Sequence, residues 1–138
     1  MQTVLFFEPD KTLSTLCKEE LEDEGYDVCL SRYERKTLAL LKKTPVNILI
    51  TEHQLEPTET YTNLLALARE VKQIPVIIFT SHPRDLIDFE WWGEMEYVSK
   101  TYNLDVLKET MREMLDYRRC IDRFSGRRSN LKQQEFYF

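Results

Sequence analysis

Residues 75–80 read PVIIFT, and this run decides the fold because it is the most strand-like stretch of the chain. A short, continuous apolar run rich in β-branched residues is typical of a strand that is buried on both faces of a sheet. Four other short runs have a similar character. We therefore predict five strands, with the other four at residues 3–7, 26–31, 47–51 and 97–99.

The segments between these runs carry apolar residues at the three- and four-residue spacing of a helix. Asp10 can cap the first helix, which should end at Gly25. The predicted helices follow Asp10, cover residues 34–43, follow a polar loop at residues 52–58, run from Pro83 to Trp92, and begin at Asn103. The chain thus alternates strand and helix throughout.

Alternation of buried strands with helices indicates an α/β fold in which a parallel sheet is covered on both faces. Five such units fit 138 residues in one domain. In open parallel sheets the functional crevice lies beyond the carboxyl ends of the strands. The residues that follow or end the predicted strands, and so form the candidate pocket, are Glu8, Asp10, Glu52, Thr80 and Lys100.

The composition, with 42% hydrophobic and 31% charged residues, is that of an ordinary globular chain. No apolar stretch approaches the roughly 20 residues needed to cross a bilayer, and the first residues lack a secretion signal. We therefore expect a cytoplasmic protein without a membrane partner. Cys17, Cys29 and Cys120 have no metal-ligand spacing, so no disulfide framework and no metal centre is predicted, and the first two are expected in the core.

Charge is distributed unevenly along the chain. Residues 1–117 carry a net charge of about −9, whereas residues 118–138 carry about +4. The basic residues of the tail are dispersed and interrupted by Asp122 and Glu135, so they do not predict a nucleic-acid site. We interpret residues 1–118 as one domain and residues 119–138 as a basic extension of the last helix or a tail.

Five segments, taken together, resemble the receiver domain of two-component response regulators. They are VLFFEPD at residues 4–10, GYDV at 25–28, NILITE at 47–52, PVIIFTS at 75–81 and EYVSK at 96–100. The resemblance extends to about Tyr117. It implies a CheY-like, flavodoxin-like, doubly wound (βα)5 fold with strand order 2-1-3-4-5, and a role in phosphorelay signal transduction through protein partners.

The resemblance also implies roles for individual residues. Thr80 matches a hydroxyl residue that follows the phosphoryl group, Tyr97 matches an aromatic residue that reports the switch, and Lys100 matches a lysine that pairs with the phosphorylated side chain. Glu52 stands where the family has the aspartate that accepts the phosphoryl group. We expect its permanent carboxylate to project toward Lys100 and Thr80 and so to imitate part of the phosphorylated state.

Two departures from the family pattern predict that the phosphoryl chemistry is lost. Adjacent acids hold a divalent cation in the family, whereas Pro9 separates Glu8 from Asp10 here, so Mg²⁺ binding should be weak or absent. Glu52 is one methylene longer than aspartate, which displaces its oxygens by about 1 Å, and such a displacement can cost roughly 100-fold in rate. We expect a phosphorylation-independent pseudo-receiver that needs no cofactor and is not an enzyme.

Simpler interpretations exist for each of these residues. Asp10 is placed to act first as a helix cap, and Glu8 and Glu52 could be solvated carboxylates at strand ends. Thr80 could belong to a turn, and Lys100 could be an ordinary surface lysine. Only the joint occurrence of these residues at the ends of successive strands favours a shared pocket.

Two other functions compete with the pseudo-receiver. The first is a functional receiver that still takes a phosphoryl group from a histidine kinase. The second is a haloacid-dehalogenase-like phosphatase, because FFEPDKTL at residues 6–13 is superficially similar to the DxDxTL motif of that family. The nucleophile would then be Glu8 in place of aspartate, and the late acidic pair that the family needs is missing, so this alternative ranks last.

An interaction face is predicted where aromatic residues cluster. Trp91 and Trp92 are neighbours about 100° apart on a helix, so one of them should be partly exposed. Tyr102 lies close in sequence, and exposed aromatic residues are enriched in binding hot spots. The resemblance implies partner binding, or a homodimer, through the fourth helix, fifth strand and fifth helix. Alternatively, both indole rings pack onto the edge of the core.

Overall fold

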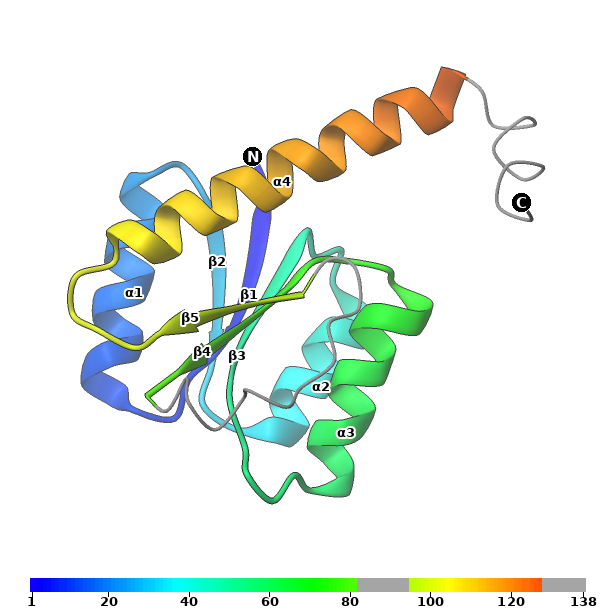
Figure 1. Ribbon diagram of the computed structural model, residues 1–138. Coiled ribbons are helices and arrows are strands. Elements are labelled where there is room, and N and C mark those ends of the chain that lie inside the picture. The colour runs from blue at the N-terminus through cyan, green and yellow to red at the C-terminus, as the bar shows by residue number, and fades with distance from the viewer. Residues whose placement is uncertain (82–94, 128–138) are drawn as a thin grey trace.

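The computed structural model describes residues 1–81 and 95–127, with the backbone alone at residues 122–127. One sheet of five parallel strands has the order β2-β1-β3-β4-β5 (Figure 1). The strands are β1 (Thr3–Phe7), β2 (Asp27–Ser31), β3 (Ile48–Glu52), β4 (Val76–Thr80) and β5 (Met95–Ser99). The prediction of a doubly wound, flavodoxin-like α/β fold with this strand order is confirmed.

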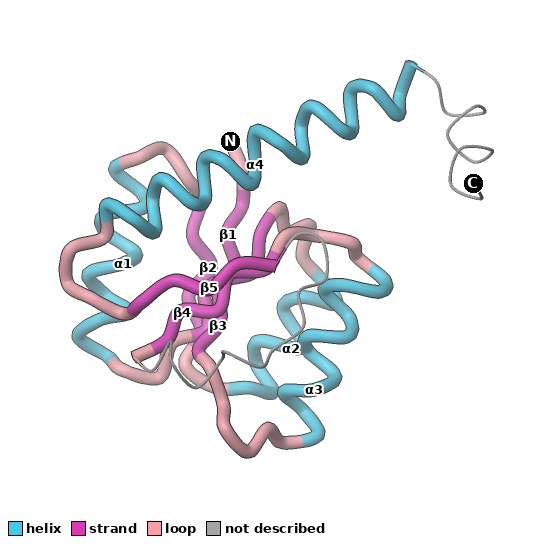
Figure 2. Tube along the Cα trace, in the orientation of Figure 1, coloured by secondary structure: helices cyan, strands magenta, loops and turns pink. Residues whose placement is uncertain are grey.

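Helices cover both faces of the sheet (Figure 2). They are α1 (Lys11–Asp23) and α4 (Asp105–Arg127) on one face, and α2 (Glu34–Lys43) and α3 (Glu59–Ala66) on the other. Successive strand residues point to opposite faces, so Val4 joins the core under α1 and α4, whereas Leu5 joins the core under α2 and α3. The sheet therefore separates two hydrophobic cores.

Two of the three cysteines belong to these cores, as their sequence context predicts. Cys17, on α1, is fully buried in the core between that helix and the sheet, and Cys29 is half-buried against the core on the other face of the sheet. Cys120 is exposed on α4. All three are free thiols.

The structure differs from the sequence predictions at the ends of several elements. β5 begins at Met95 because this side chain is buried in the core under α2 and α3. α3 is followed by a π-helical turn at Leu67–Val71, whose wider winding leaves Val71 exposed. α4 begins only at Asp105, because Asn103 turns the chain and accepts a hydrogen bond from the Asp105 amide at 3.0 Å. None of these differences changes the strand order.

The last helix, α4, continues past Tyr117 to Arg127, and its second half projects beyond the sheet (Figure 1). The helix crosses the predicted boundary at residues 118–119 without a break, and the division into a domain and an extension stays a prediction. The helix predicted at residues 83–92 lies outside the described residues. Among the helices that are described, none has the length and apolar character required to span a bilayer.

Candidate functional site

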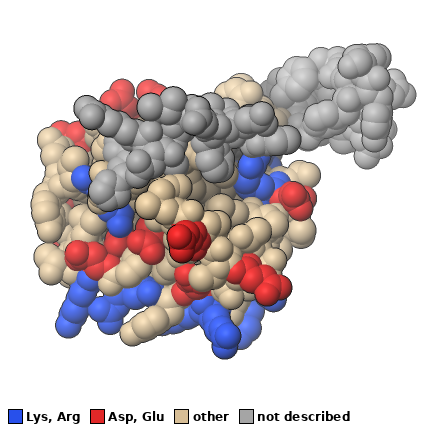
Figure 3. Space-filling view, turned by 60° about the horizontal axis from the view of Figure 1, so that its bottom comes forward, with Lys and Arg blue, Asp and Glu red and all other residues tan. Residues whose placement is uncertain are grey.

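The carboxyl ends of the five strands meet at one edge of the sheet, which Figure 3 brings forward. Acidic side chains lie across the middle of this face, and basic side chains line its lower rim. Glu8 follows β1, Glu52 ends β3, Thr80 ends β4 and Lys100 follows β5. The topology thus gathers at one edge the residues that the sequence analysis selected.

Lys100 forms its shortest ion pair with Glu8. The Lys100 Nζ lies 2.6 Å from Glu8 Oε1, on a carboxylate side chain that is only 1% exposed. Among the described residues, Glu8 Oε1 accepts no hydrogen bond, so this contact is an ion pair. The second oxygen, Oε2, accepts a hydrogen bond from the Asp10 amide at 3.0 Å. Both oxygens of this buried carboxylate are therefore engaged.

Glu52 is a second, weaker partner of the same ammonium group. Its Oε1 lies 3.8 Å from Lys100 Nζ, beyond hydrogen-bonding distance, and its side chain is 24% exposed. Burial raises the pKa of the Glu52 carboxyl, the charge of Lys100 opposes this rise, and the charge of Glu8 adds to it. Glu52, the residue expected to project toward Lys100, is thus the more distant of the two carboxylates, and Glu8 is the nearer partner.

Thr80 lies at the same edge and is buried at the end of β4. Its backbone oxygen accepts a hydrogen bond from the Lys100 amide at 2.6 Å. Because Thr80 and Ser99 are paired in register, this bond extends the β4–β5 ladder by one residue beyond β5. The backbone of Lys100 is thereby fixed at the start of the loop that leads to α4.

Asp10 caps α1, which is the simpler of its two interpretations. Its Oδ1 accepts a hydrogen bond from the Leu13 amide at 2.8 Å, and the residue itself is exposed. Pro9, between Glu8 and Asp10, carries no side-chain oxygen. Of the two acids in this segment, one is thus paired with Lys100 and the other holds a helix end.

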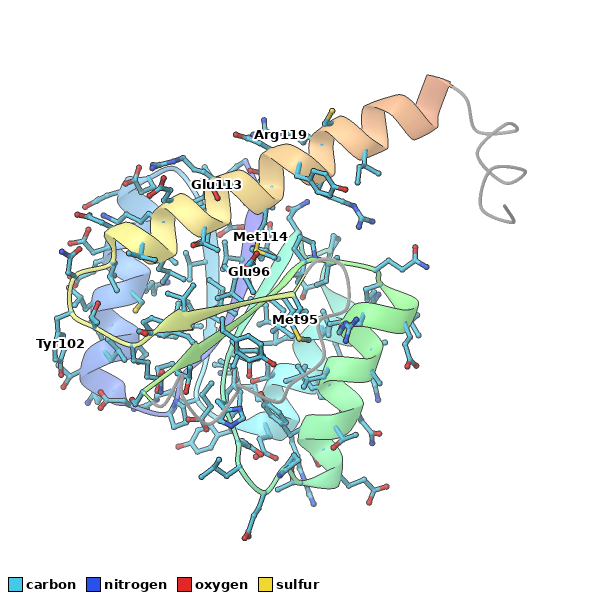
Figure 4. The ribbon with its side chains drawn as sticks, in the orientation of Figure 1. Met95, Glu96, Tyr102, Glu113, Met114 and Arg119 are labelled. Carbon is cyan, nitrogen blue, oxygen red and sulfur yellow. The ribbon has the colours of Figure 1, made fainter. Side chains whose placement is uncertain are left out.

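The other predicted residues lie apart from this ion-pair cluster or outside the described residues. Tyr97 packs on the face covered by α2 and α3, where burial raises the pKa of its phenol to about 12. Tyr102 is exposed in the loop before α4, at the far end of the molecule from the projecting half of that helix (Figure 4). Trp91 and Trp92 lie outside the described residues, so the interaction face stays a prediction.

A polar network that the sequence analysis missed fixes the loop after β3. Gln54 Nε2 donates to Glu34 Oε1 at 2.6 Å, and Thr58 Oγ1 donates to Glu34 Oε2 at 2.5 Å. Thr58 also caps α3 by accepting from the Tyr61 amide, and the Tyr61 hydroxyl donates to the backbone oxygen of Glu52. A threonine just before a helical repeat is a recognisable cap signal, but its bond to Glu34 depends on the fold.

Cys17 lies close enough to the ion pair for the charges of Glu8 and Lys100 to shift the pKa of its thiol. Burial raises the pKa of the Cys17 thiol to about 12, and the charge of Glu8 adds to the rise whereas that of Lys100 opposes it. A thiol is nucleophilic only as the thiolate. Cys17 is therefore a neutral core residue and not a nucleophile of this site.

Comparison with known proteins identifies the family. Residues 4–112 match the family model described as the response regulator receiver domain. The transcriptional regulatory protein CpxR of Klebsiella pneumoniae is 29% identical over 118 residues, which cover 83% of this chain and 50% of that protein. The chain therefore spans about half the length of this relative.

Solved structures agree with the fold. The response regulator TrrA of Thermotoga maritima, in complex with Mg²⁺-BeF, has a TM-score of 0.71 at 23% identity and covers 83% of this chain and 99% of its own. TrrA in complex with the histidine kinase ThkA gives a TM-score of 0.70 at 24% identity, with the same coverage. Because the family model matches most of its length, this chain belongs to the response regulator receiver domain family of two-component signalling.

Proposed function

We propose that this receiver domain is a protein–protein interaction switch that works without phosphorylation. The observation that carries the proposal is the 2.6 Å ion pair between Lys100 Nζ and the buried carboxylate of Glu8. By resemblance, Lys100 is the residue that would pair with a phosphorylated side chain. Here its ammonium group already has two permanent carboxylate partners, Glu8 and Glu52.

The donor atoms at this edge support a site with weak or absent Mg²⁺ binding. Mg²⁺ requires near-octahedral oxygen ligands at about 2.0–2.1 Å. Glu8 uses one oxygen for Lys100 and the other for the Asp10 amide, while Asp10 caps α1 and Pro9 offers no donor. Within residues 1–81 and 95–121, no three His, Cys, Asp or Glu side chains gather as a metal site would need. The residues present do not fit the ion.

The position of Glu52 supports the loss of phosphoryl transfer. Transfer to a carboxylate depends on in-line positioning and on neutralisation of the developing charge by a metal ion. Glu52 is longer than the aspartate of the family, and its carboxyl pKa is raised by burial. Both features make it a poorer acceptor than an ionised aspartate beside Mg²⁺. The second candidate, a receiver that is still phosphorylated, has no comparable support from the geometry.

The same geometry argues against a phosphatase of the haloacid-dehalogenase type. Such an enzyme would use Glu8 as its nucleophile, but this side chain is 1% exposed and paired with Lys100. A substrate could reach the carboxylate only after that ion pair was broken. We propose a signalling module that is not an enzyme.

The partner that we propose is a protein of a two-component pathway. TrrA, which shares the fold of this chain, has been solved in complex with a histidine kinase, and this supports a partner of that class. The chain carries a net charge of −5, which does not favour nucleic acid as a direct partner. CpxR is a transcriptional regulator, but only half of its length is matched.

Intact-mass measurement after incubation with acetyl phosphate and Mg²⁺ tests the proposal. We expect no phosphoryl adduct on the wild-type chain. The double variant Pro9→Asp, Glu52→Asp reinstates both family residues, so we expect it to gain one phosphoryl group that is lost again in Pro9→Asp, Glu52→Asn. Circular dichroism checks that each variant folds.

Two outcomes would contradict this account. A wild-type adduct that Glu52→Gln removes would show that Glu52 is a working acceptor. If the folded double variant stays unmodified, positions 9 and 52 are not the cause of the inactivity, and the argument from the two departures fails. Beryllofluoride with Mg²⁺, the ligand seen in TrrA, gives a test without covalent chemistry. We expect it to bind the double variant Pro9→Asp, Glu52→Asp and not the wild type.

A further inference from the structure

Two large apolar side chains are exposed on adjacent loops at the carboxyl edge of the sheet. Tyr33, between β2 and α2, is 67% exposed, and Leu55, between β3 and α3, is 68% exposed. Their chain neighbours Glu34 and Gln54 are joined by a hydrogen bond of 2.6 Å, so the two loops lie side by side. Tyr33 and Leu55 therefore belong to one small surface, which contains no residue of the ion-pair cluster around Lys100.

The backbone of Tyr33 is fixed although its side chain is in solvent. Its carbonyl oxygen accepts hydrogen bonds from the Thr37 amide at 3.0 Å and from the Ser31 hydroxyl at 3.1 Å. Glu34, the first residue of α2, is held by two further side-chain hydrogen bonds from the β3–α3 loop. The aromatic ring thus projects from an ordered backbone, which lowers the entropic cost of binding a partner there.

Tyrosine is an unfavourable residue for this position in the fold. Tyr33 is the N-cap of α2, where a side-chain oxygen normally accepts a hydrogen bond from the first turn, and it makes no such bond. Serine, threonine, asparagine or aspartate at this position would stabilise the helix. Local choices that oppose stability are expected at functional sites. The exposed ring therefore favours a role in binding over a role in folding.

Basic side chains flank Tyr33 in the sequence. Arg32, Arg35 and Lys36 are exposed, and none of them forms an ion pair in the part of the chain that the structure describes. Glu34 is the acidic residue of this segment, and both of its carboxylate oxygens are engaged by the β3–α3 loop. The segment is therefore a local positive patch on a chain of net charge −5.

Carboxylates limit the extent of this positive patch. Glu56 follows Leu55 directly and Glu59 begins α3, and both are exposed. Acidic side chains also lie across the middle of the face that the carboxyl ends of the strands form (Figure 3). An extended polyanion such as nucleic acid would run from the patch onto these carboxylates, whereas a short acidic protein segment need not.

We propose that this surface docks a short acidic segment of a partner protein, and we define it by Tyr33, Leu55, Arg32, Arg35 and Lys36. Carboxylates of the segment would pair with the three cations, while one apolar side chain would pack against Tyr33 and Leu55. Tyrosine and arginine are enriched among the residues that dominate binding energy. The surface differs from the interaction face predicted from the sequence, and the proposal does not depend on whether the domain is phosphorylated.

Selection from a phage-displayed library of random short peptides on the full chain tests the proposal. We expect the selected peptides to carry several Asp or Glu residues and at least one large apolar residue. Fluorescence anisotropy of the synthesised peptides should show an affinity that falls as salt is added. Tyr33→Ser should weaken binding by about tenfold or more. Tyr102→Ser is the matched control, because Tyr102 is 69% exposed elsewhere on the molecule, and it should leave binding unchanged.

Two lysines of α2 provide a matched pair of charge reversals. Lys36→Glu lies within the patch and should weaken peptide binding by about tenfold. Lys43→Glu makes the same change at the last residue of the helix, on the same side and about 10 Å further along the axis. It should have little effect.

Thermal denaturation separates a lost contact from a lost fold. Serine can supply the missing N-cap oxygen, so Tyr33→Ser should bind more weakly while its melting temperature equals or exceeds that of the wild type. A melting temperature well below the wild type would show that the ring supports the fold instead. Selected peptides without acidic residues, peptides whose binding Tyr33→Ser and Lys36→Glu leave unchanged, or tighter binding of a single-stranded oligonucleotide would each overturn the proposal.

Discussion

The ends of β1 and β3 carry the same residue type at the same edge of the sheet, yet the two glutamates differ in environment. Glu8 is 1% exposed and lies 2.6 Å from Lys100 Nζ, whereas Glu52 is 24% exposed and lies 3.8 Å from the same atom. The ammonium group therefore belongs mainly to Glu8. Strand position and the loops around each carboxylate, more than chemical identity, decide how strongly each is held.

The backbone explains the difference. Glu8 continues the ladder between β1 and β2 through its amide, which donates to Ser31 at 3.0 Å, and the Asp10 amide donates to its carboxylate. The Glu52 backbone is held by the Tyr61 hydroxyl, but its side chain remains partly in solvent. The Coulomb attraction within an ion pair is stronger in a poorly hydrated site than in contact with water. Removal of one partner is also more costly there, because the other charge is left buried.

Removal of the shared ammonium should give the largest effect. Lys100→Met leaves Glu8 buried without a counter-ion, which typically costs about 3–5 kcal/mol in the free energy of unfolding. Urea denaturation near neutral pH measures this loss. Lys108→Met is the control, because Lys108 pairs with Glu20 and Glu24, whose side chains are well exposed, and it should cost far less. Equal losses for the two variants would mean that burial of Glu8 does not matter.

Asp10 offers an intermediate test of the segment that holds Glu8. Asp10→Ala removes the cap of α1 and should lower the free energy of unfolding by about 1 kcal/mol, whereas Asp10→Asn keeps a capping oxygen and should cost only a few tenths. Thermal denaturation without added metal compares the two. If asparagine were as damaging as alanine, the negative charge of Asp10, and not its cap, would be what stabilises this end of β1.

Substitution of Glu52 should give the smallest change in the free energy of unfolding, and this change should have the opposite sign. Burial raises the pKa of this carboxyl above its ordinary value of 4.5, so the native state favours the protonated form. Ionised Glu52 therefore destabilises the fold above its native pKa, and this penalty fades as the pH falls through that raised pKa and is absent below about 4.5. Glu52→Gln should raise the free energy of unfolding near neutral pH by less than about 1 kcal/mol.

The measurement is urea denaturation of the wild type and Glu52→Gln, once near neutral pH and once below about pH 4.5. We expect the stability difference between them to disappear in acid. Destabilisation by Glu52→Gln near neutral pH would show that the contact with Lys100 outweighs burial. The claim that Lys100 is paired mainly with Glu8, and only weakly with Glu52, would then be wrong.

Much of the fold could be predicted because its signals are local. Unbroken apolar runs such as residues 75–80 mark strands buried on both faces, and the rule for parallel sheets places Glu52, Thr80 and Lys100 at one edge. The strand order itself came from the resemblance to receiver domains. No local pattern distinguishes the order 2-1-3-4-5 from other arrangements of five such strands.

The partner of Lys100 could not be predicted from the sequence. Family resemblance paired this lysine with position 52, but a difference of about 1 Å in side-chain position depends on packing that no spacing reveals. Glutamate at a strand end is usually solvated, so the near-complete burial of Glu8 gave no signal either. The π-helical turn that exposes Val71 likewise has no signal in the sequence.

A pair of double-mutant cycles tests the central claim most directly, namely that Glu8 and not Glu52 holds Lys100. The cycles combine Lys100→Met with Glu8→Gln and with Glu52→Gln, and urea denaturation gives each free energy of unfolding. We predict a coupling energy above about 1.5 kcal/mol for Lys100 with Glu8 and below about 0.5 kcal/mol for Lys100 with Glu52. A coupling to Glu52 that equals or exceeds the coupling to Glu8 would contradict the account.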